Sequence, residues 1–230
     1  MSHYRVFVIH KPDQNYEDLL APYDENLEVE PYLEYTREQA IVYARKAYPN
    51  LSEGKDDEAC FQLVAEDYPE DCVDKDGNIY STYNPQSKWD WYCIGGRFGL
   101  IDENEEEIMV KDFKNTIDMD EYNWRLRFWD IAVEGAPLKE NEDAVDFESI
   151  YKPEYFKERY GTRERFAEYN SRDIPYAVVT PDGEWHSVGT MGWFGISDDD
   201  KDTDTWMKEF DDIIKNSDPY DRIISIDCHI

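Results

Sequence analysis

Two runs of apolar residues, one at each end of the sequence, predict strands of a sheet. Residues 4–10 read YRVFVIH and are bounded by Lys11 and Pro12, which is typical of a buried strand. Residues 223–230 form the second run, in which apolar and polar positions alternate. One face carries Ile224, Ile226, Cys228 and Ile230, and the other carries Ser225, Asp227 and His229. We therefore expect a strand at each end of the chain.

Helices are predicted by a capping motif and by apolar residues at helical spacing. Thr36 and Gln39 have the spacing of a capping box, which predicts a helix that ends before Pro49. Further helices are expected over residues 57–67, 121–133 and 152–172, and in a segment that follows the aspartates at 198–204 and ends near Asn216.

Two Asp-Gly pairs mark turns between these segments. Asp76-Gly77 and Asp182-Gly183 are each followed by an aromatic-rich or alternating run, and each predicts a β-hairpin. Strands mixed with unequal helices favour an α+β fold, with a mixed, largely antiparallel sheet and flanking helices. We expect a single domain over residues 1–230, with a helical acidic insertion at residues 103–175.

The charge of the chain limits what it can bind. It contains 54 Asp and Glu against 24 Lys and Arg, for a formal net charge of -30 in 230 residues. Aromatic residues make up 15%, which disordered acidic tails lack, so we expect a folded protein with an anionic surface. Such a surface repels nucleic acid and anionic lipid and attracts a cationic partner. The absence of an 18-residue apolar stretch and of a signal-peptide pattern predicts a cytoplasmic protein without a membrane span.

The residues that usually bind metals or cofactors form no known pattern here. Four cysteines lie at wide, unrelated spacings without a C-x-x-C pair, which favours reduced thiols over a disulfide scaffold or a zinc site. The run from Cys72 to Tyr83 imitates half a calcium loop but has Cys and Tyr where carboxylate ligands belong. No phosphate-binding loop or dinucleotide fingerprint occurs. We predict no cofactor and no metal.

The densest unusual segment is residues 88–99, KWDWYCIGGRFG. As a strand it would place Trp89 and Trp91 on one face and Asp90 and Tyr92 on the other, and its paired glycines would let another backbone approach closely. Two indoles, a carboxylate and the guanidinium of Arg97 can clamp a planar or anionic ligand. The alternative is an aromatic core with a buried pair between Asp90 and Arg97. The candidate ligand-binding residues are Trp89, Asp90, Trp91, Tyr92 and Arg97.

Several motifs together resemble a scattered family of acidic proteins from phages and other mobile elements. They are Pro22-Tyr23-x-Glu25-Asn26, Asn84-Pro85-x-Ser87-Lys88-Trp89-Asp90-Trp91-Tyr92-x-x-Gly95-Gly96-Arg97, Met191-Gly192-Trp193-Phe194-Gly195 and Asp227-Cys228-His229. The resemblance covers most of the chain. It implies a phage-type accessory protein expressed in a host cytoplasm, of a kind that often inhibits host defences, and it implies no particular activity.

Asp227 and His229 are the candidate catalytic residues, together with Arg97. The two share one face of the predicted C-terminal strand, and His10, at the end of the other terminal strand, would lie at the same sheet edge if the two strands ran parallel. An Asp-x-His with a second His suits a metal or a general acid-base pair. The alternative is a polar strand end that faces solvent.

Two functions follow from these features. In the first, the acidic surface occupies the basic channel of a host nuclease or another nucleic-acid-binding protein, as an anti-CRISPR or anti-restriction inhibitor that imitates nucleic acid without binding it. The candidate partner-binding residues are Glu103, Glu105, Glu106, Glu107, Asp198, Asp199, Asp200, Asp202 and Asp204. In the second, a small-molecule-binding protein or hydrolase uses the Trp89–Arg97 segment with Asp227 and His229. A surface kept acidic only for solubility is the alternative to the first.

Overall fold

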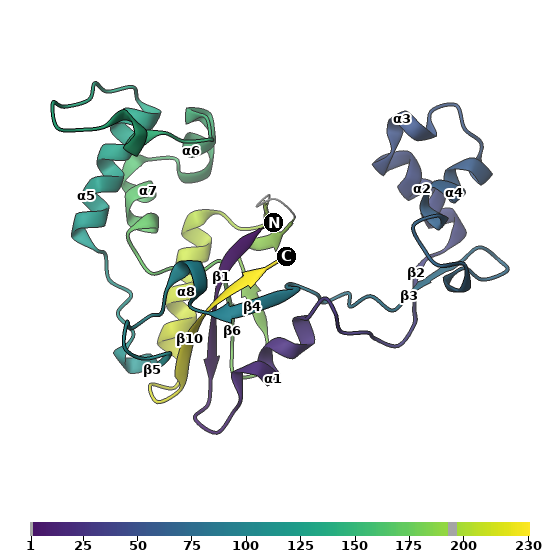
Figure 1. Ribbon diagram of the computed structural model, residues 1–230, viewed down its shortest axis with the longest axis horizontal. Helices are drawn as coiled ribbons and strands as arrows, with labels where there is room; N and C mark the ends of the chain where they lie inside the picture. Colours follow the sequence, from purple (N-terminus) through teal and green to yellow (C-terminus); the bar gives the residue numbers. More distant parts are fainter. Residues whose placement is uncertain (1, 193–196) are drawn as a thin grey trace. The chain divides into compact units, whose positions relative to one another are not determined.

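A computed structural model describes residues 2–192 and 197–230 and divides the chain into two compact units. The larger unit comprises Met1–Pro22 and Lys88–Ile230, and the smaller comprises Tyr23–Ser87. The described residues have an α+β fold with eight α-helices and a mixed, largely antiparallel sheet of six strands, as predicted (Figure 1). We expected one domain with an insertion at residues 103–175. Residues 103–175 lie in the larger unit and contain helices of the expected insertion, and residues 23–87 form the smaller unit.

The sheet of the larger unit is built around the two terminal strands. Its order is β4-β10-β1-β6-β7, and β5 also pairs with β10. The strands are β1 (His3–His10), β4 (Trp91–Ile94), β5 (Glu107–Met109), β6 (Ala177–Val179), β7 (Trp185–Ser187) and β10 (Arg222–His229). β1 runs parallel to β6, while the other pairs are antiparallel. The predicted strands at the two ends of the chain and the hairpin at Asp182-Gly183 are confirmed.

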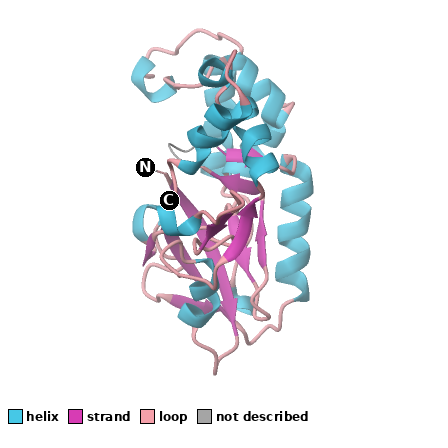
Figure 2. Ribbon diagram, turned by 90° about the vertical axis from the view of Figure 1, so that its right-hand side faces the viewer, coloured by secondary structure: helices cyan, strands magenta, loops and turns pink. Residues whose placement is uncertain are grey.

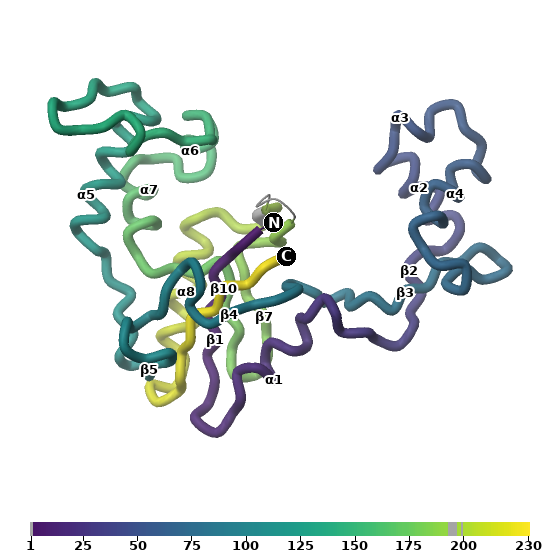
Figure 3. Tube along the Cα trace, in the orientation of Figure 1, coloured from purple at the N-terminus to yellow at the C-terminus, as the bar shows by residue number. Residues whose placement is uncertain are grey.

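The antiparallel pairing of β1 with β10 decides which histidines meet. It places His3 opposite His229 and His10 opposite Arg222. The expectation that His10 lies beside His229 is therefore wrong, because it required parallel strands. Figure 3 shows the N-terminal strand in purple beside the C-terminal strand in yellow, with both ends of the chain close together. Backbone hydrogen bonds between Ser2 and Ile230 close this end, at 3.1 and 3.2 Å.

Helices cover both faces of the β1–β10 pair. The long helix α8 (Thr203–Asn216) runs along one face (Figure 2), where Trp206 and Phe210 pack with Phe7 and Ile223 in a buried core. Asp202 begins α8 by accepting the N–H of Thr205 at 2.8 Å. The short helix α1 (Tyr16–Leu20) contacts β1 with buried leucines. Both faces of the terminal strands are therefore covered by helices. The side chains of each face pack into a core, instead of one face packing into a core and the other facing solvent.

The helical part of the larger unit has an aromatic core of its own. It comprises α5 (Met119–Phe128), a π-helical turn (Trp129–Val133), a 3₁₀ turn (Ala144–Phe147), α6 (Pro153–Tyr160) and α7 (Arg163–Asn170). Phe128, Trp129, Phe156 and Phe166 are among the buried residues that pack together. The predicted single helix over residues 152–172 is broken at Gly161, whose φ of 72° lies in the left-handed region and ends α6.

The smaller unit packs helices α2 and α4 against each other and pairs two short strands. Its elements are β2 (Tyr32–Tyr35), α2 (Arg37–Ala47), α3 (Pro49–Ser52), α4 (Asp57–Ala65), a 3₁₀ turn (Glu70–Cys72) and β3 (Ile79–Ser81). The predicted capping box is present, since Thr36 and Gln39 bond to each other's backbone N–H. Ala40, Ala44 and Phe61 fill the core between the helices. The predicted turn at Asp76-Gly77 is closed by one antiparallel bridge between Val73 and Ile79, but β3 otherwise pairs with β2, so the predicted hairpin does not extend beyond that bridge.

The remaining elements are short. They are 3₁₀ turns at Ala21–Tyr23, Gly96–Phe98 and Val110–Asp112 and the strand pair β8 (Gly189–Met191) and β9 (Ser197–Asp199). The motif at residues 191–195 falls mostly on 193–196, which lie outside the described residues. No helix in the described part of the chain is long and apolar enough to cross a membrane.

Candidate acid-base centre

Two segments far apart in the sequence meet at one end of the sheet. β4 pairs antiparallel with the last residues of β10, so that Cys93 lies opposite Asp227 and Trp91 opposite His229. The aromatic-glycine segment and the terminal Asp-Cys-His thus form one site. We call His3, Asp90, Trp91, Asp227 and His229 the acid-base centre.

His229 is buried and held through one ring nitrogen only. Its Nδ1 lies 2.6 Å from Asp90 Oδ1, and because a carboxylate oxygen accepts, the ring donates through Nδ1. Its Nε2 is buried and has no hydrogen-bond partner among the described residues. Trp91 stacks on the imidazole with a centroid separation of 5.0 Å and an interplanar angle of 19°. The Trp91 side chain is half-exposed, so it forms the outer side of the centre.

Asp227 anchors the rest of the centre and explains the paired glycines. The residue is 1% exposed, its Oδ1 accepts from His3 Nδ1 at 2.9 Å, and its Oδ2 accepts the backbone N–H of Arg97 at 2.9 Å. Gly96 has a φ of 51°, and a Cβ there would lie 2.4 Å from Asp227 Cβ and Oδ2. Only glycine lets this backbone approach the carboxylate, as the sequence predicted for the pair.

The two imidazoles lie next to each other. The ring centroids of His3 and His229 are 5.0 Å apart, and each ring is oriented by a carboxylate on its Nδ1. This is the arrangement by which proteins present Nε2 for proton transfer. The sequence analysis missed His3. His3 follows only from the antiparallel pairing of the two terminal strands, which brings the first and last residues together.

Two of the predicted ligand-binding residues, Trp89 and Tyr92, lie outside the acid-base centre. β4 begins at Trp91, so the strand alternation does not extend back to Trp89. The buried Trp89 donates Nε1–H to the carbonyl of Leu20 at 3.3 Å and packs edge-on against Tyr92, with centroids 5.0 Å apart. The expectation that Trp89 shares a face with Trp91 is wrong. Trp89 and Tyr92 lie on the α1 side of the sheet, away from the acid-base centre.

The alternatives proposed for these residues are also corrected. Asp90 pairs with His229, and the side chain of Arg97 is exposed, so the described residues contain no buried pair between Asp90 and Arg97. Asp227 and His229 do share a face, as predicted, but with exposures of 1% and 5% they are not a polar strand end that faces solvent.

The face of β10 behind the centre is apolar and shifts the ionisation of its polar groups. Burial, with a smaller contribution from Asp227, raises the pKa of the Cys228 thiol well above its usual value. Burial likewise raises the pKa of Tyr4, whose hydroxyl donates to the carbonyl of Lys88. Both groups therefore stay protonated at neutral pH.

The nine predicted partner-binding acids divide into three sets. Glu107 accepts from His10 Nε2 at 3.0 Å, Asp202 caps α8, and Asp204 forms an ion pair with Arg165. Asp199 lies in β9. The remaining five are exposed and, within the described residues, have no cationic side chain within 4 Å: Glu103, Glu105, Glu106, Asp198 and Asp200.

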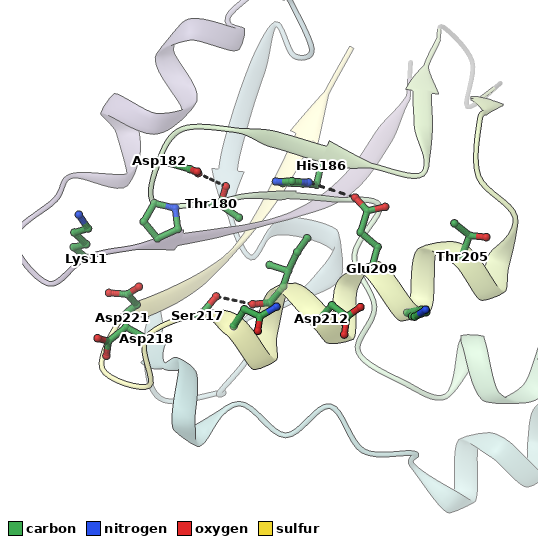
Figure 4. Close-up of a pocket in the computed structure, with 14 residues that line it drawn as sticks. Lys11, Thr180, Asp182, His186, Thr205, Glu209, Asp212, Ser217, Asp218 and Asp221 are labelled. Carbon is green, nitrogen blue, oxygen red and sulfur yellow. Dashed lines mark hydrogen bonds and ion pairs between the residues drawn. The ribbon is translucent and has the colours of Figure 1, made fainter.

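A cavity of about 750 Å³ lies elsewhere, between the β6–β7 hairpin and α8 (Figure 4). None of the predicted site residues lines it. Figure 4 shows His186 and Glu209 pointing toward each other, with Nδ1 and Oε1 3.3 Å apart, and Lys201 Nζ lies 2.7 Å from Glu209 Oε2. His186, Glu209 and Lys201 thus have partners within the protein, whereas Nε2 of His229 has no hydrogen-bond partner among the described residues. The cavity was not foreseen from the sequence.

The described residues contain no group of three or more His, Cys, Asp or Glu arranged to hold a metal ion. The chain matches no protein-family model, and no curated protein and no solved structure is significantly similar to it. A functional proposal for this protein therefore rests on its own residues.

Proposed function

We propose that the protein is a small-molecule hydrolase that uses the acid-base centre. The observation that carries the proposal is the buried Nε2 of His229, which lacks a hydrogen-bond partner among the described residues while Nδ1 is fixed by Asp90. Leaving a buried polar atom unpaired costs about 1–3 kcal/mol. A substrate or water that bonds to this nitrogen during the reaction would account for that cost.

The two imidazoles divide the proton transfers of a hydrolysis. His229 Nε2 takes a proton from a water molecule, whose oxygen forms a bond to the carbonyl carbon or phosphorus of the substrate. The bond to the leaving oxygen breaks, and that oxygen takes a proton from the imidazolium of His3. Asp90 and Asp227 orient the two rings and stabilise the positive charge that each ring carries in turn.

The surroundings of the centre limit its substrates. The net charge of -30 repels polyanions, which favours small substrates over nucleic acid. The half-exposed Trp91 offers an indole face for a planar group, and Arg97, one residue after Gly96, offers an exposed guanidinium for an anionic one.

Variants that keep the size of the side chains test the proposal. Asp90→Asn removes the acceptor that orients His229, and His3→Gln removes the second imidazole. We expect each to lower kcat for a small chromogenic ester by about 100-fold, with the melting temperature measured in parallel. Unchanged kcat in both folded variants would refute the hydrolase proposal.

A second proposal is the acidic inhibitor of a host nucleic-acid-handling protein, of the phage-encoded, cytoplasmic type. It is supported by the five exposed acids without a cationic neighbour, which are free to face a basic channel. Reversal of Glu103, Glu105 and Glu106 to Lys should weaken capture of a nuclease at low salt and flatten its salt dependence. Equal reversal of Asp198 and Asp200 tests the other group. Capture unaffected by both reversals would refute this proposal.

A further inference from the structure

The smaller unit contains a cavity whose lining carries no cationic side chain. It measures about 440 Å³ and lies wholly within residues 23–87. Its lining includes three tyrosines and two glutamates: Tyr68, Tyr80, Tyr83, Glu25 and Glu28. Tyrosine rings present a negative π face, and carboxylates carry full negative charge, so both kinds of group attract a cation.

The walls of the cavity are fixed by hydrogen bonds. The buried Asn84 donates through Nδ2 to the carbonyl of Asp24 at 3.0 Å, and Val29 N–H bonds to the carbonyl of Thr82 at 3.0 Å. These bonds hold the loop that carries Glu25 and Glu28 against β3, which carries Tyr80, and against the segment after β3, which carries Tyr83. Little ordering is then required when a ligand binds.

Two of the tyrosines have committed hydroxyls. Tyr83 accepts from the hydroxyl of Ser87 at 2.8 Å. Burial, together with a hydrogen bond to Glu34, raises the pKa of Tyr68 far above its usual value. The Tyr68 phenol therefore stays neutral, and its hydroxyl is hydrogen-bonded to Glu34. A ligand in the cavity would contact the ring of Tyr68 rather than its hydroxyl.

The composition of the smaller unit agrees with this lining. Residues 23–87 contain sixteen Asp and Glu against five Lys and Arg, and eight of the 18 tyrosines of the chain. Residues of two sequence motifs that take no part in the acid-base centre meet at this cavity. Glu25 and Asn26 line it, and Asn84 and Ser87 brace it.

We infer that this cavity binds an alkylammonium group, either of a small quaternary amine or of a lysine side chain. The aromatic rings supply the surface on which the alkyl carbons of the cation pack, and Glu25 and Glu28 neutralise its charge. The binding is independent of the hydrolase proposal, since it uses a different unit and none of the same residues.

Calorimetric titration of the full chain tests the inference, with two probes: choline and a short lysine-rich peptide. The carbon isostere of choline, in which a neutral carbon replaces the charged nitrogen, is the control ligand. We expect one site for choline and at least about tenfold weaker binding of the isostere. Binding of the peptide alone would assign the site to a protein partner, and it also supports the alkylammonium chemistry.

Variants distinguish binding in the cavity from general attraction of a cation to the negatively charged protein. Glu25→Gln and Tyr80→Leu should each weaken binding about tenfold, while Tyr80→Phe should retain it because the π face remains. Glu38→Gln removes an equal charge from the exposed side of α2 in the same unit and should have no effect. The inference is overturned if neither probe binds, if choline and its isostere bind alike, or if Glu25→Gln and Glu38→Gln weaken binding equally.

Discussion

The two ends of the β1–β10 strand pair each bury a histidine beside a carboxylate, but only one of them leaves a nitrogen unused. At one end, His10 Nδ1 faces the carbonyls of Lys11 and Gln14 at 3.0 and 2.9 Å, and its Nε2 faces Glu107 at 3.0 Å. At the other end, His229 meets Asp90 through Nδ1 and meets nothing among the described residues through Nε2. Both histidines are 5% exposed.

The difference teaches how to tell a structural histidine from a candidate for chemistry. Equal burial and an equal carboxylate neighbour do not separate the two residues, whereas the number of satisfied ring nitrogens does. His10 ties the end of β1 to the following turn and to β5. His229 is buried without a full set of hydrogen bonds. A ligand that binds beside it would supply the missing hydrogen bond.

The largest expected effect concerns Gly96, the glycine whose backbone lies beside Asp227. Gly96→Ala brings a Cβ to 2.4 Å from Asp227 at a φ of 51°, and we expect it to lower the free energy of unfolding by about 3 kcal/mol. Gly99→Ala, at a φ of 74° with nothing within 4 Å, should cost only about 1 kcal/mol. Urea denaturation measures both. Equal costs would mean that Asp227 yields to the methyl group.

The second effect compares the histidines directly. His10→Gln disrupts contacts at both ring nitrogens and should cost about 2 kcal/mol of stability, whereas His229→Gln disrupts one and should cost about 1 kcal/mol. The same denaturation experiment measures the two variants. A larger loss for His229→Gln would show that His229 is the more structural of the two.

The third effect is a difference in alkaline pH dependence. Burial raises the pKa of Cys228, so above about pH 8.5 the unfolded chain loses a thiol proton that the folded chain keeps. Stability from this group is present below that pH and is lost as pH rises, by up to about 1.4 kcal/mol per pH unit. Cys228→Ala should flatten the decline between pH 8.5 and 9.5. An unchanged slope would contradict the raised pKa.

The smallest effect lies at the His10 end and is a difference in stability between pH 4 and pH 7. Burial and the charge of the neighbouring Asp218 raise the pKa of Asp221, while a backbone hydrogen bond at Asp218 and the charges of Lys11 and His10 oppose the shift. A raised carboxyl pKa makes the folded state hold its proton longer, so stability from this group is lost as pH rises through the folded pKa. Asp221→Asn should remove that loss and stabilise the protein slightly at neutral pH. Denaturation at pH 4 and pH 7 measures it, and a destabilised variant at pH 7 would contradict the shift.

The sequence predicted most of the elements because their signals are local. The β-branched runs, the capping box at Thr36 and the Asp182-Gly183 turn each act over a few residues. The contiguity of Asp227 and His229 on one face followed from the period of a strand. The function classes suggested by the charge stay predictions.

The predictions that were wrong concern features that depend on pairing between segments far apart in the sequence. Whether β1 and β10 run parallel decides whether His10 or His3 joins His229, and nothing in either strand encodes that choice. Trp89 leaves the face of Trp91 because β4 begins only at Trp91, where pairing with β10 starts. The separation of residues 23–87 is likewise a matter of contacts rather than composition.

The most direct test of the account is the turnover of small chromogenic carboxylic and phosphoric esters by the wild type, His229→Gln and His10→Gln. All three are compared at equal folded fraction. We predict turnover of at least one ester by the wild type, a loss of about 100-fold in His229→Gln, and retained activity in His10→Gln. No turnover by the wild type, or equal losses in the two variants, would contradict the claim that the His229 end is the acid-base centre.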